Sequence, residues 1–311
     1  MTRGTVSTPA ACAVVFGSSS TGPARNGGLQ TVLGVSLPLL AGPADELLLA
    51  NAEAPRTVGE FILFEAPGRR AGFAVAPEGR ELEAATRELY AGLFAATRGL
   101  HLYRIWNYVP LINAQNRNLE NYRLFCRGRS LAFEQRFGPG FKKLLPAASA
   151  VGTASGPLAL GFLAGETAPL HFENPRQVPA FEYPPQYGPR SPSFARATSV
   201  AGDGGRQIFI SGTAAITGHQ TMAAGDCDGQ LTLAFENLQT IAATAGAGPN
   251  LGAGSTHRAF KVYLRRATDL APVQRRLQRE LLQPGDTIQI LQADVCRADL
   301  LVEIEAVLTD R

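Results

Sequence analysis

The acidic residues near the C-terminus are the first candidates for chemistry. In the segment LLVEIEAV (300–307), the period of a strand places Glu303 and Glu305 on one face, among apolar neighbours. An acid with apolar neighbours is desolvated, which raises its pKa and lets it donate a proton near neutral pH. We therefore predict that Glu303 is a general acid. The alternative is that this strand face is solvated and carries no chemistry.

A cysteine precedes this acid. Cys296 lies seven residues before Glu303, at the end of the preceding turn or strand. Its thiol could take part in a reaction, or it could fill the core as a small hydrophobic residue. The next residue is Arg297, which on a strand would point to the opposite side. We therefore expect Cys296, rather than Arg297, to face Glu303.

Arginines are the predicted anion-binding groups. Of the 29 basic residues, 26 are arginine, whose planar fork suits carboxylates better than the ammonium group of lysine. Arg129 follows Tyr122 by two helical turns, so both face the same way. Arg190 and Arg196 lie shortly before the turn SGTA (211–214), whose backbone N–H groups could bind an anion. The alternatives are surface ion pairs for the arginines and a plain hairpin for the turn.

Composition excludes several classes of protein. The formal net charge of +3 over 311 residues does not predict a nucleic-acid surface. No apolar run reaches the roughly 20 residues of a membrane-spanning helix, and the N-terminus lacks the apolar stretch of a signal peptide. The four cysteines do not have zinc-site spacing. We expect a cytoplasmic protein with free thiols, without a metal, nucleic-acid or membrane partner.

The predicted elements repeat. The first half reads β-β-α-β-α-β-β, and so does the second, which indicates an α+β fold built from two copies of one unit. The alternative is that any two α/β segments look alike at this level. The predicted strands are 10–16, 31–37, 61–65, 72–75, 101–109, 144–151, 158–164, 207–211, 214–217, 257–264, 287–294 and 300–308. The predicted helices are 80–98, 118–137, 231–242 and 270–282.

A proline-rich crossover separates the copies. The stretch 172–197 is rich in proline and aromatic residues, unlike a flexible linker. We therefore expect it to be ordered and to deliver side chains to a site. The predicted organisation is an N-terminal unit (1–171), the crossover (172–197) and a C-terminal unit (198–311) that carries the acid. The matching segment of the first copy, LALGFLAG, has no acid, which predicts that the first copy is not catalytic.

The second copy resembles the RidA/YjgF family of imine deaminases. The resemblance rests on GPRSPSFARA (188–197), QIFISGTAAITG (207–218) and LLVEIEAV (300–307). It implies two tandem RidA/YjgF-like, chorismate-mutase-like units packed side by side, in a fold family whose trimers place sites between subunits. That family's substrate-binding arginine has no counterpart in IQILQADV, and Arg190 replaces its motif tyrosine. The resemblance therefore implies the fold and not imine deamination.

The whole chain resembles the chorismatases more specifically. Six blocks occur in that family's order: HLYRIWNYVPLIN, NYRLFCRGRSLAFE, LPAASAVGT, GPRSPSFARA, SGTAAITGH and VCRADLLVEIEAV. This resemblance implies an enzyme that removes pyruvate from chorismate by protonating its enolpyruvyl group, without a metal or organic cofactor. It aligns Glu303, and not Glu305, with the acid of the closing strand. A cysteine at position 296 goes with the subgroup that forms 3-hydroxybenzoate.

Other outcomes stay open. The products could instead be 3,4-dihydroxycyclohexa-1,5-diene carboxylate, by hydrolysis, or a mixture of 3- and 4-hydroxybenzoate. A non-catalytic module that binds small acids is the alternative of another class. A monomer or a small homo-oligomer is expected. The predicted site comprises Glu303 and Cys296 as catalytic groups, with Tyr122, Arg129, Arg190, Arg196, Gly212, Thr213 and Ala214 as substrate-binding groups.

Overall fold

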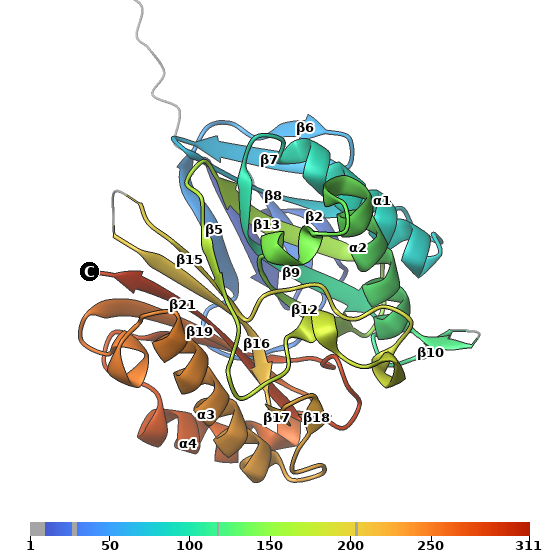
Figure 1. Ribbon diagram of the computed structural model, residues 1–311. Helices are drawn as coiled ribbons and strands as arrows, with labels where there is room; N and C mark the ends of the chain where they lie inside the picture. Colours follow the sequence, from blue (N-terminus) through green and yellow to red (C-terminus); the bar gives the residue numbers. More distant parts are fainter. Residues whose placement is uncertain (1–9, 27–29, 117, 203–204) are drawn as a thin grey trace, which may run out of the picture.

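A computed structural model describes residues 10–26, 30–116, 118–202 and 205–311. Within these ranges, three large β-sheets, two two-stranded sheets and four α-helices form the molecule (Figure 1). Among the described residues, no helix combines the length and the apolar character needed to cross a membrane.

The first unit is a six-stranded sheet with two helices on one face. In spatial order the strands are β12 (Ala147–Thr153), β9 (His101–Pro110), β13 (Ala159–Gly165), β8 (Arg69–Val75), β7 (Phe61–Ala66) and β6 (Arg56–Val58). The helices are α1 (Leu82–Ala96) and α2 (Asn121–Phe137). The Glu81 carboxylate caps α1 by accepting from Ala84 N. At Gly128, a Cβ atom would lie 2.6 Å from the carbonyl oxygen of Glu83. Glycine therefore lets α2 pack closely on α1, which fixes the position of Arg129.

The second unit repeats this arrangement. Its strands, in spatial order, are β14 (Leu170–Phe172), β15 (Ala197–Val200), β16 (Gln207–Ala214), β21 (Val302–Asp310), β19 (Thr256–Leu264), β20 (Thr287–Gln292) and β4 (Leu39–Ala41). The helices are α3 (Cys227–Thr244) and α4 (Leu270–Glu280). The order β15-β16-β21-β19-β20 corresponds to β7-β8-β13-β9-β12, and in both units only the last pair is parallel. The expected α+β fold, built from two copies of one unit packed side by side, is confirmed.

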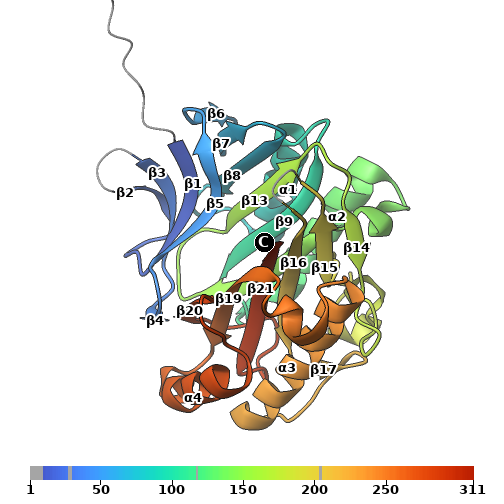
Figure 2. The ribbon, with the colours of Figure 1, turned by 90° about the vertical axis from the view of Figure 1, so that its left-hand side faces the viewer.

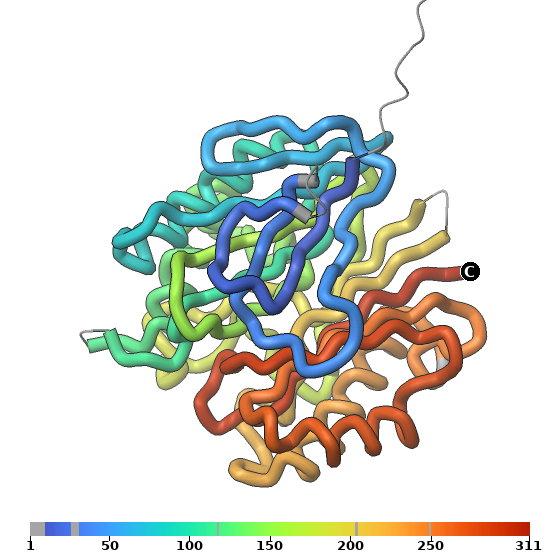
Figure 3. Tube along the Cα trace, turned by 180° about the vertical axis from the view of Figure 1, so that it is seen from behind, coloured from blue at the N-terminus to red at the C-terminus, as the bar shows by residue number. Residues whose placement is uncertain are grey.

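The N-terminal segment forms a third sheet that the sequence pattern predicted only in part. Its strands, in spatial order, are β2 (Gly22–Asn26), β3 (Gln30–Val35), β1 (Ala10–Phe16) and β5 (Asp45–Ala52). Val14 of β1, Trp106 of β9 and Phe209 of β16 belong to one buried apolar core. The third sheet therefore packs against the inner faces of both units, and Figures 2 and 3 show its strands (blue) beside them. The helices occupy the outer faces, where each unit has its own core.

Several boundaries differ from the predictions. The strand predicted at 144–151 begins only at Ala147, because Phe141–Leu144 form a turn of 3-10 helix. The crossover is ordered, as expected, and contains the short 3-10 helices Ala180–Glu182 and Pro185–Tyr187. The turn predicted at 211–214 and the hairpin of 207–211 with 214–217 are wrong, because Gln207–Ala214 form one continuous strand, β16. The hairpin comes later and pairs β17 (Ile216–Thr217) with β18 (Gln220–Thr221). A further small hairpin pairs β10 (Gln115–Asn116) with β11 (Leu119–Glu120).

The division at 171 and 197 stays a prediction. Strand β14 spans the proposed boundary at 171 and pairs with β15 of the second sheet.

Candidate active site

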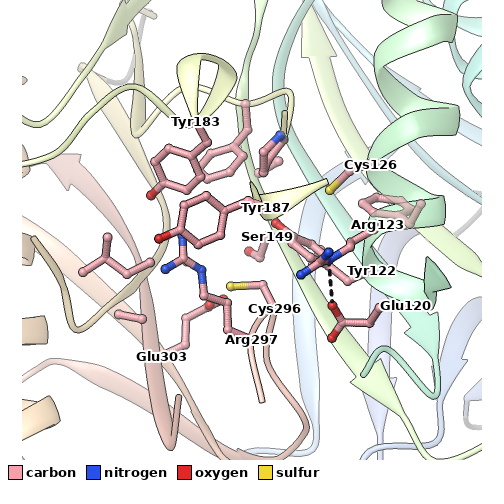
Figure 4. A pocket seen from close by; sticks show the side chains of 18 of the residues that line it. Glu120, Tyr122, Arg123, Cys126, Ser149, Tyr183, Tyr187, Cys296, Arg297 and Glu303 are labelled. Carbon is pink, nitrogen blue, oxygen red and sulfur yellow. Dashed lines mark ion pairs between the residues drawn. The ribbon is translucent and has the colours of Figure 1, made fainter. Parts of the chain in front are cut away.

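A cavity of about 340 Å³ lies where the two units and the crossover meet. Backbone hydrogen bonds hold this junction together: Gly152 N donates to Asp294 O over 2.7 Å, and Ala195 N donates to Pro146 O over 3.0 Å. Figure 4 shows side chains from both units pointing into the space between them. Of the nine residues predicted for the site, seven line this cavity: Tyr122, Arg129, Arg196, Gly212, Ala214, Cys296 and Glu303.

Glu303 is a buried acid in the cavity wall. It lies on β21, the strand between β16 and β19, and is only 4% exposed. Burial raises the pKa of its carboxyl to about 8, and the nearby charge of Glu305 adds to this, whereas Arg104 and Arg196 act against it. At neutral pH, Glu303 is therefore mainly protonated and able to donate a proton.

Gly212 is the neighbour that makes room for this carboxyl group. A Cβ atom on Gly212 would lie 2.0 Å from Glu303 Oε1 and 2.6 Å from its Cδ. The contact falls at a break in the ladder of β16 and β21, where pairing shifts register between Ile210 and Thr213. Glycine is thus required here because the Glu303 carboxyl occupies the space of a side chain.

Glu305 has a different environment, although it shares a strand face with Glu303. Its carboxylate accepts hydrogen bonds from Arg104 (2.7 Å), Trp106 (2.9 Å) and Lys261 (2.8 Å). Burial alone would raise the pKa of Glu305, but the charges of Lys261 and Arg104 and its hydrogen bonds lower it. The structure thus separates the two acids into a protonated one at the cavity and an ionised one behind it.

Two of the predicted arginines line the cavity and keep N–H groups that are available to a ligand. Arg129 is buried on α2, and its guanidinium lies 5.4 Å from the ring centroid of Tyr90. Among the described residues, its Nε and Nη2 have no hydrogen-bond partner. Arg196 donates from Nη2 to the hydroxyl of Tyr183 over 2.7 Å, while its buried Nε finds no partner in the part of the chain that the structure describes. Buried, unpaired guanidinium donors are costly unless an anion accepts from them. Both side chains therefore fit a carboxylate ligand.

A third arginine at the cavity was missed. Arg297 was expected to point away, but residues 293–301 form a loop rather than a continuing strand, and its side chain lines the cavity. The guanidinium lies 4.1 Å from the ring centroid of Tyr187 and donates to Thr221 Oγ1 over 3.1 Å. Its position next to Cys296 could have predicted that Arg297 lies at the cavity. The assumption that residues alternate along a strand led to the opposite prediction.

Two predicted residues do not reach the cavity. Arg190 forms an ion pair with Glu134 over 2.9 Å, and both side chains are more than a third exposed. Thr213 donates from Oγ1 to the carbonyl oxygen of Ser211 over 2.8 Å, on the face of β16 opposite Gly212 and Ala214. The predictions for Arg190 and Thr213 are therefore corrected. Arg190 pairs with a carboxylate at the surface, and strand alternation directs the Thr213 side chain away from the cavity.

Two thiols line the cavity beside Tyr122. Burial, followed by the nearby charge of Glu303, raises the pKa of Cys296 to about 12. Burial likewise raises the pKa of Cys126 to about 12, and this second cysteine had not been predicted. Both thiols are therefore protonated near neutral pH and can donate a hydrogen bond, but they do not provide a thiolate nucleophile. Tyr122 stacks on Phe125, with 6.5 Å between ring centroids.

The site combines one protonated acid with several guanidinium groups, which suits proton transfer to a small organic anion. Within the described ranges, no group of three or more His, Cys, Asp or Glu side chains is placed to hold a metal ion.

Comparison with known proteins identifies relatives of the chain. Residues 67–164 match the sequence family described as chorismatase FkbO/Hyg5-like, N-terminal. The chain is 41% identical to a 3-hydroxybenzoate synthase of Streptomyces hygroscopicus, over 86% of this chain and 82% of that protein. It is 38% identical to a chorismatase of Streptomyces rapamycinicus, over 83% of this chain and 80% of that protein.

A solved structure agrees with the sequence relatives. The crystal structure of a chorismatase superposes with a TM-score of 0.84 and 30% identity, covering 97% of this chain and 93% of that one. Agreement in sequence and in fold over nearly the whole length shows that the chain belongs to the chorismatase family of enzymes.

Proposed function

We propose that this protein removes pyruvate from chorismate and forms 3-hydroxybenzoate. The observation that carries this proposal is the protonated, buried Glu303 at a cavity with unpaired guanidinium donors. Chorismate carries two carboxylates and an enol ether, so it needs both features. The relative named 3-hydroxybenzoate synthase supports this product.

The proposed reaction begins at the enolpyruvyl group. Glu303 donates its proton to the terminal methylene carbon, which gives an oxocarbenium ion. The C4 hydroxyl oxygen then attacks C3 as the C3–O bond breaks, and the electrons of that bond form the ketone of pyruvate. The hydroxyl proton is released, and the Glu303 carboxylate is proposed to accept it. Opening of the resulting epoxide and loss of a ring proton give 3-hydroxybenzoate, so chorismate is divided between two products and no water is consumed.

The two arginines have distinct proposed roles. Arg196 is close enough to Glu303 to lower its pKa by its charge, and the enolpyruvyl carboxylate must lie near the carbon that Glu303 protonates. We therefore assign the enolpyruvyl carboxylate to Arg196. Arg129 lies on α2 of the other unit and is assigned the ring carboxylate. Tyr122 and the backbone at Gly212 and Ala214 are proposed to enclose the ring.

Replacing either arginine by lysine is expected to raise KM for chorismate by about tenfold or more, since a hydrogen bond to a charged group contributes about 1.5–3 kcal/mol. An ammonium group keeps the charge of Arg129 or Arg196 but loses the fork. Arg190→Ala is the matched control, because this side chain pairs with Glu134 at the surface. Steady-state kinetics decide the matter: equal KM values for wild type, R129K and R196K would contradict the assignment.

Cys296 is proposed to determine which product forms after pyruvate is released. A protonated thiol at the ring can donate to the epoxide oxygen and assist ring opening. We expect Cys296→Ala to keep pyruvate release within about tenfold while the fraction of 3-hydroxybenzoate among the products falls. Cys126→Ala, which removes the second thiol of the cavity, is the control. Chromatography of the aromatic and dihydrodiol products measures the ratio, and an unchanged ratio in C296A would refute this role.

Incubation with chorismate tests the function itself. Pyruvate is followed by a coupled reductase assay, and 3-hydroxybenzoate by chromatography. Equal amounts of the two products support the proposal. Pyruvate with the dihydrodiol or with 4-hydroxybenzoate supports the hydrolytic or mixed alternatives, which the relatives named simply chorismatase leave open. Binding of chorismate without release of pyruvate would support the non-catalytic module.

Location and assembly are also proposals. All four cysteines carry free thiols, which supports work in the reducing cytoplasm. A monomer or small homo-oligomer is supported by the pairing of β4 with β20, which covers one edge of the second sheet. The mass from light scattering measures the oligomeric state.

A further inference from the structure

A buried ionic cluster lies directly behind the cavity. The cluster consists of Glu46, Arg104, Ser149, Lys261 and Glu305. Lys261 Nζ donates to Glu305 over 2.8 Å and to Glu46 over 2.5 Å, while Arg104 donates to Glu305 over 2.7 Å. The hydroxyl of Ser149 also donates to Glu305. Side chains from all three sheets therefore meet in this cluster, and those of Arg104, Ser149 and Lys261 donate to Glu305.

Ser149 is the cluster residue that lines the cavity, and Glu305 lies beside Glu303 on the same strand. Glu305 and Glu303 are alternate residues of β21, so their side chains leave the same face of the strand, roughly 7 Å apart along it. Ser149 lines the cavity, and its hydroxyl group donates a hydrogen bond to Glu305. The Glu305 carboxylate is consequently fixed behind the proposed proton donor by several hydrogen bonds.

The charges around Glu303 come from several elements. Glu305 on the same strand is the nearby anion, and it is buried like Glu303 itself. Arg104 on β9 and Arg196 of the crossover oppose its effect, and the thiol of Cys296 is uncharged near neutral pH. Arg297, Asp299, Glu120 and Arg123 also line the cavity.

A buried ion cluster contributes little to stability compared with apolar residues of the same volume. Such a cluster has a larger effect on the pKa of a neighbouring acid, because a fixed anion disfavours a second negative charge nearby. The net charge of the cluster is zero when both acids are ionised and both bases protonated. The protonated form of Glu303 is therefore favoured by the position of the Glu305 carboxylate beside it, and not by the net charge of the cluster.

We propose that Glu305 is a positioning residue whose fixed negative charge holds Glu303 in its proton-donating form, while Arg104, Lys261 and Ser149 hold Glu305 in place. The pKa of Glu303 agrees with this assignment, because the charge of Glu305 is the main cause of its rise after burial. The inference rests on the proposed function, in which Glu303 is the proton donor.

The test compares two carboxylates of the same cluster. In Glu305→Gln, the anion beside Glu303 is lost and the two cations remain, so we expect the high-pH loss of kcat to move down by about one pH unit or more. At pH 6, kcat and KM should stay within about threefold of wild type. Glu46→Gln removes the carboxylate on the far side of Lys261, and its pH profile should match that of wild type.

Infrared titration gives a readout that does not depend on turnover. The carboxylic-acid stretch of Glu303, identified by its absence in Glu303→Gln, should disappear at lower pH in E305Q than in wild type or E46Q. This titration distinguishes the two proposals. If chorismate is not a substrate but the stretch shifts as expected, the proposed function fails and the role of Glu305 stands.

Three results would overturn the inference: an unmoved titration in E305Q, a shift to higher pH, or an equal shift in E46Q. If E305Q does not fold, the double variant Glu305→Gln/Lys261→Met removes one charge of each sign and keeps the cluster neutral. The same downward shift is expected there, because the lost anion is the one beside Glu303, and its absence would equally overturn the inference.

Discussion

Glu303→Gln is expected to lower kcat for pyruvate release by roughly 10²–10⁴-fold, the usual contribution of a positioned general acid. Glutamine keeps the size and polarity of the side chain but cannot donate a proton to carbon. KM should change little, because the arginines that are proposed to bind the carboxylates are untouched. The thermal midpoint should not fall, because the variant replaces a mainly protonated acid with a neutral amide.

The control for this variant is a second carboxylate at the same cavity. Glu120 lines the cavity and pairs with Arg123 over 3.5 Å. Glu120→Gln should therefore retain kcat within about threefold, while E303Q loses it. Full activity in E303Q, or an equal loss in both variants, would show that the proton comes from another group.

Gly212→Ala is expected to have the second largest effect. The added Cβ would lie 2.0 Å from Glu303 Oε1, so the carboxyl group has to leave its present position. We expect kcat to fall by about 10²-fold, in line with the cost of a small misplacement of a catalytic group. Overpacking of this kind should also lower the free energy of unfolding by about 1–3 kcal/mol.

Gly140→Ala separates the effect on the acid from a general effect of adding a methyl group. No atom of the described residues lies within 4 Å of a Cβ atom at Gly140, so that variant should match wild type in kcat and in stability. Chemical denaturation and steady-state kinetics measure both quantities. Normal turnover in G212A would mean that the position of the Glu303 carboxyl group does not limit the reaction.

The sequence pattern predicted those parts of the site that depend on short-range periodicity. Alternation along one strand put Glu303 and Glu305 on one face, and helical spacing put Arg129 on the face of Tyr122. The repeated order of strands and helices predicted the two units. Each of these inferences needs only neighbours along the chain, whose directions are fixed by the geometry of strands and helices.

The remaining features depend on contacts between distant segments. Arg190 pairs with Glu134, which comes from another element, so its sequence block gave no sign that it turns away. Arg297 was misplaced because a loop, rather than a strand, separates β20 from β21. The partners of Glu305 lie 44 to 201 residues away, and sequence periodicity carries no information about such pairs. The third sheet was recognised only in part, because its short strands bury apolar residues only when both units are present.

The pH dependence of kcat/KM is the sharpest test of Glu303 as a proton donor that is protonated at neutral pH, because kcat/KM reports ionisation of the free enzyme. The pKa of Glu303 is raised to about 8, so the acid is protonated below that value and loses its proton above it. We expect a kcat/KM that is constant between pH 6 and 7 and falls about tenfold per pH unit well above pH 8. A kcat/KM that rises through this range, or that falls only as the pH drops below 7, would show that Glu303 is not the donor.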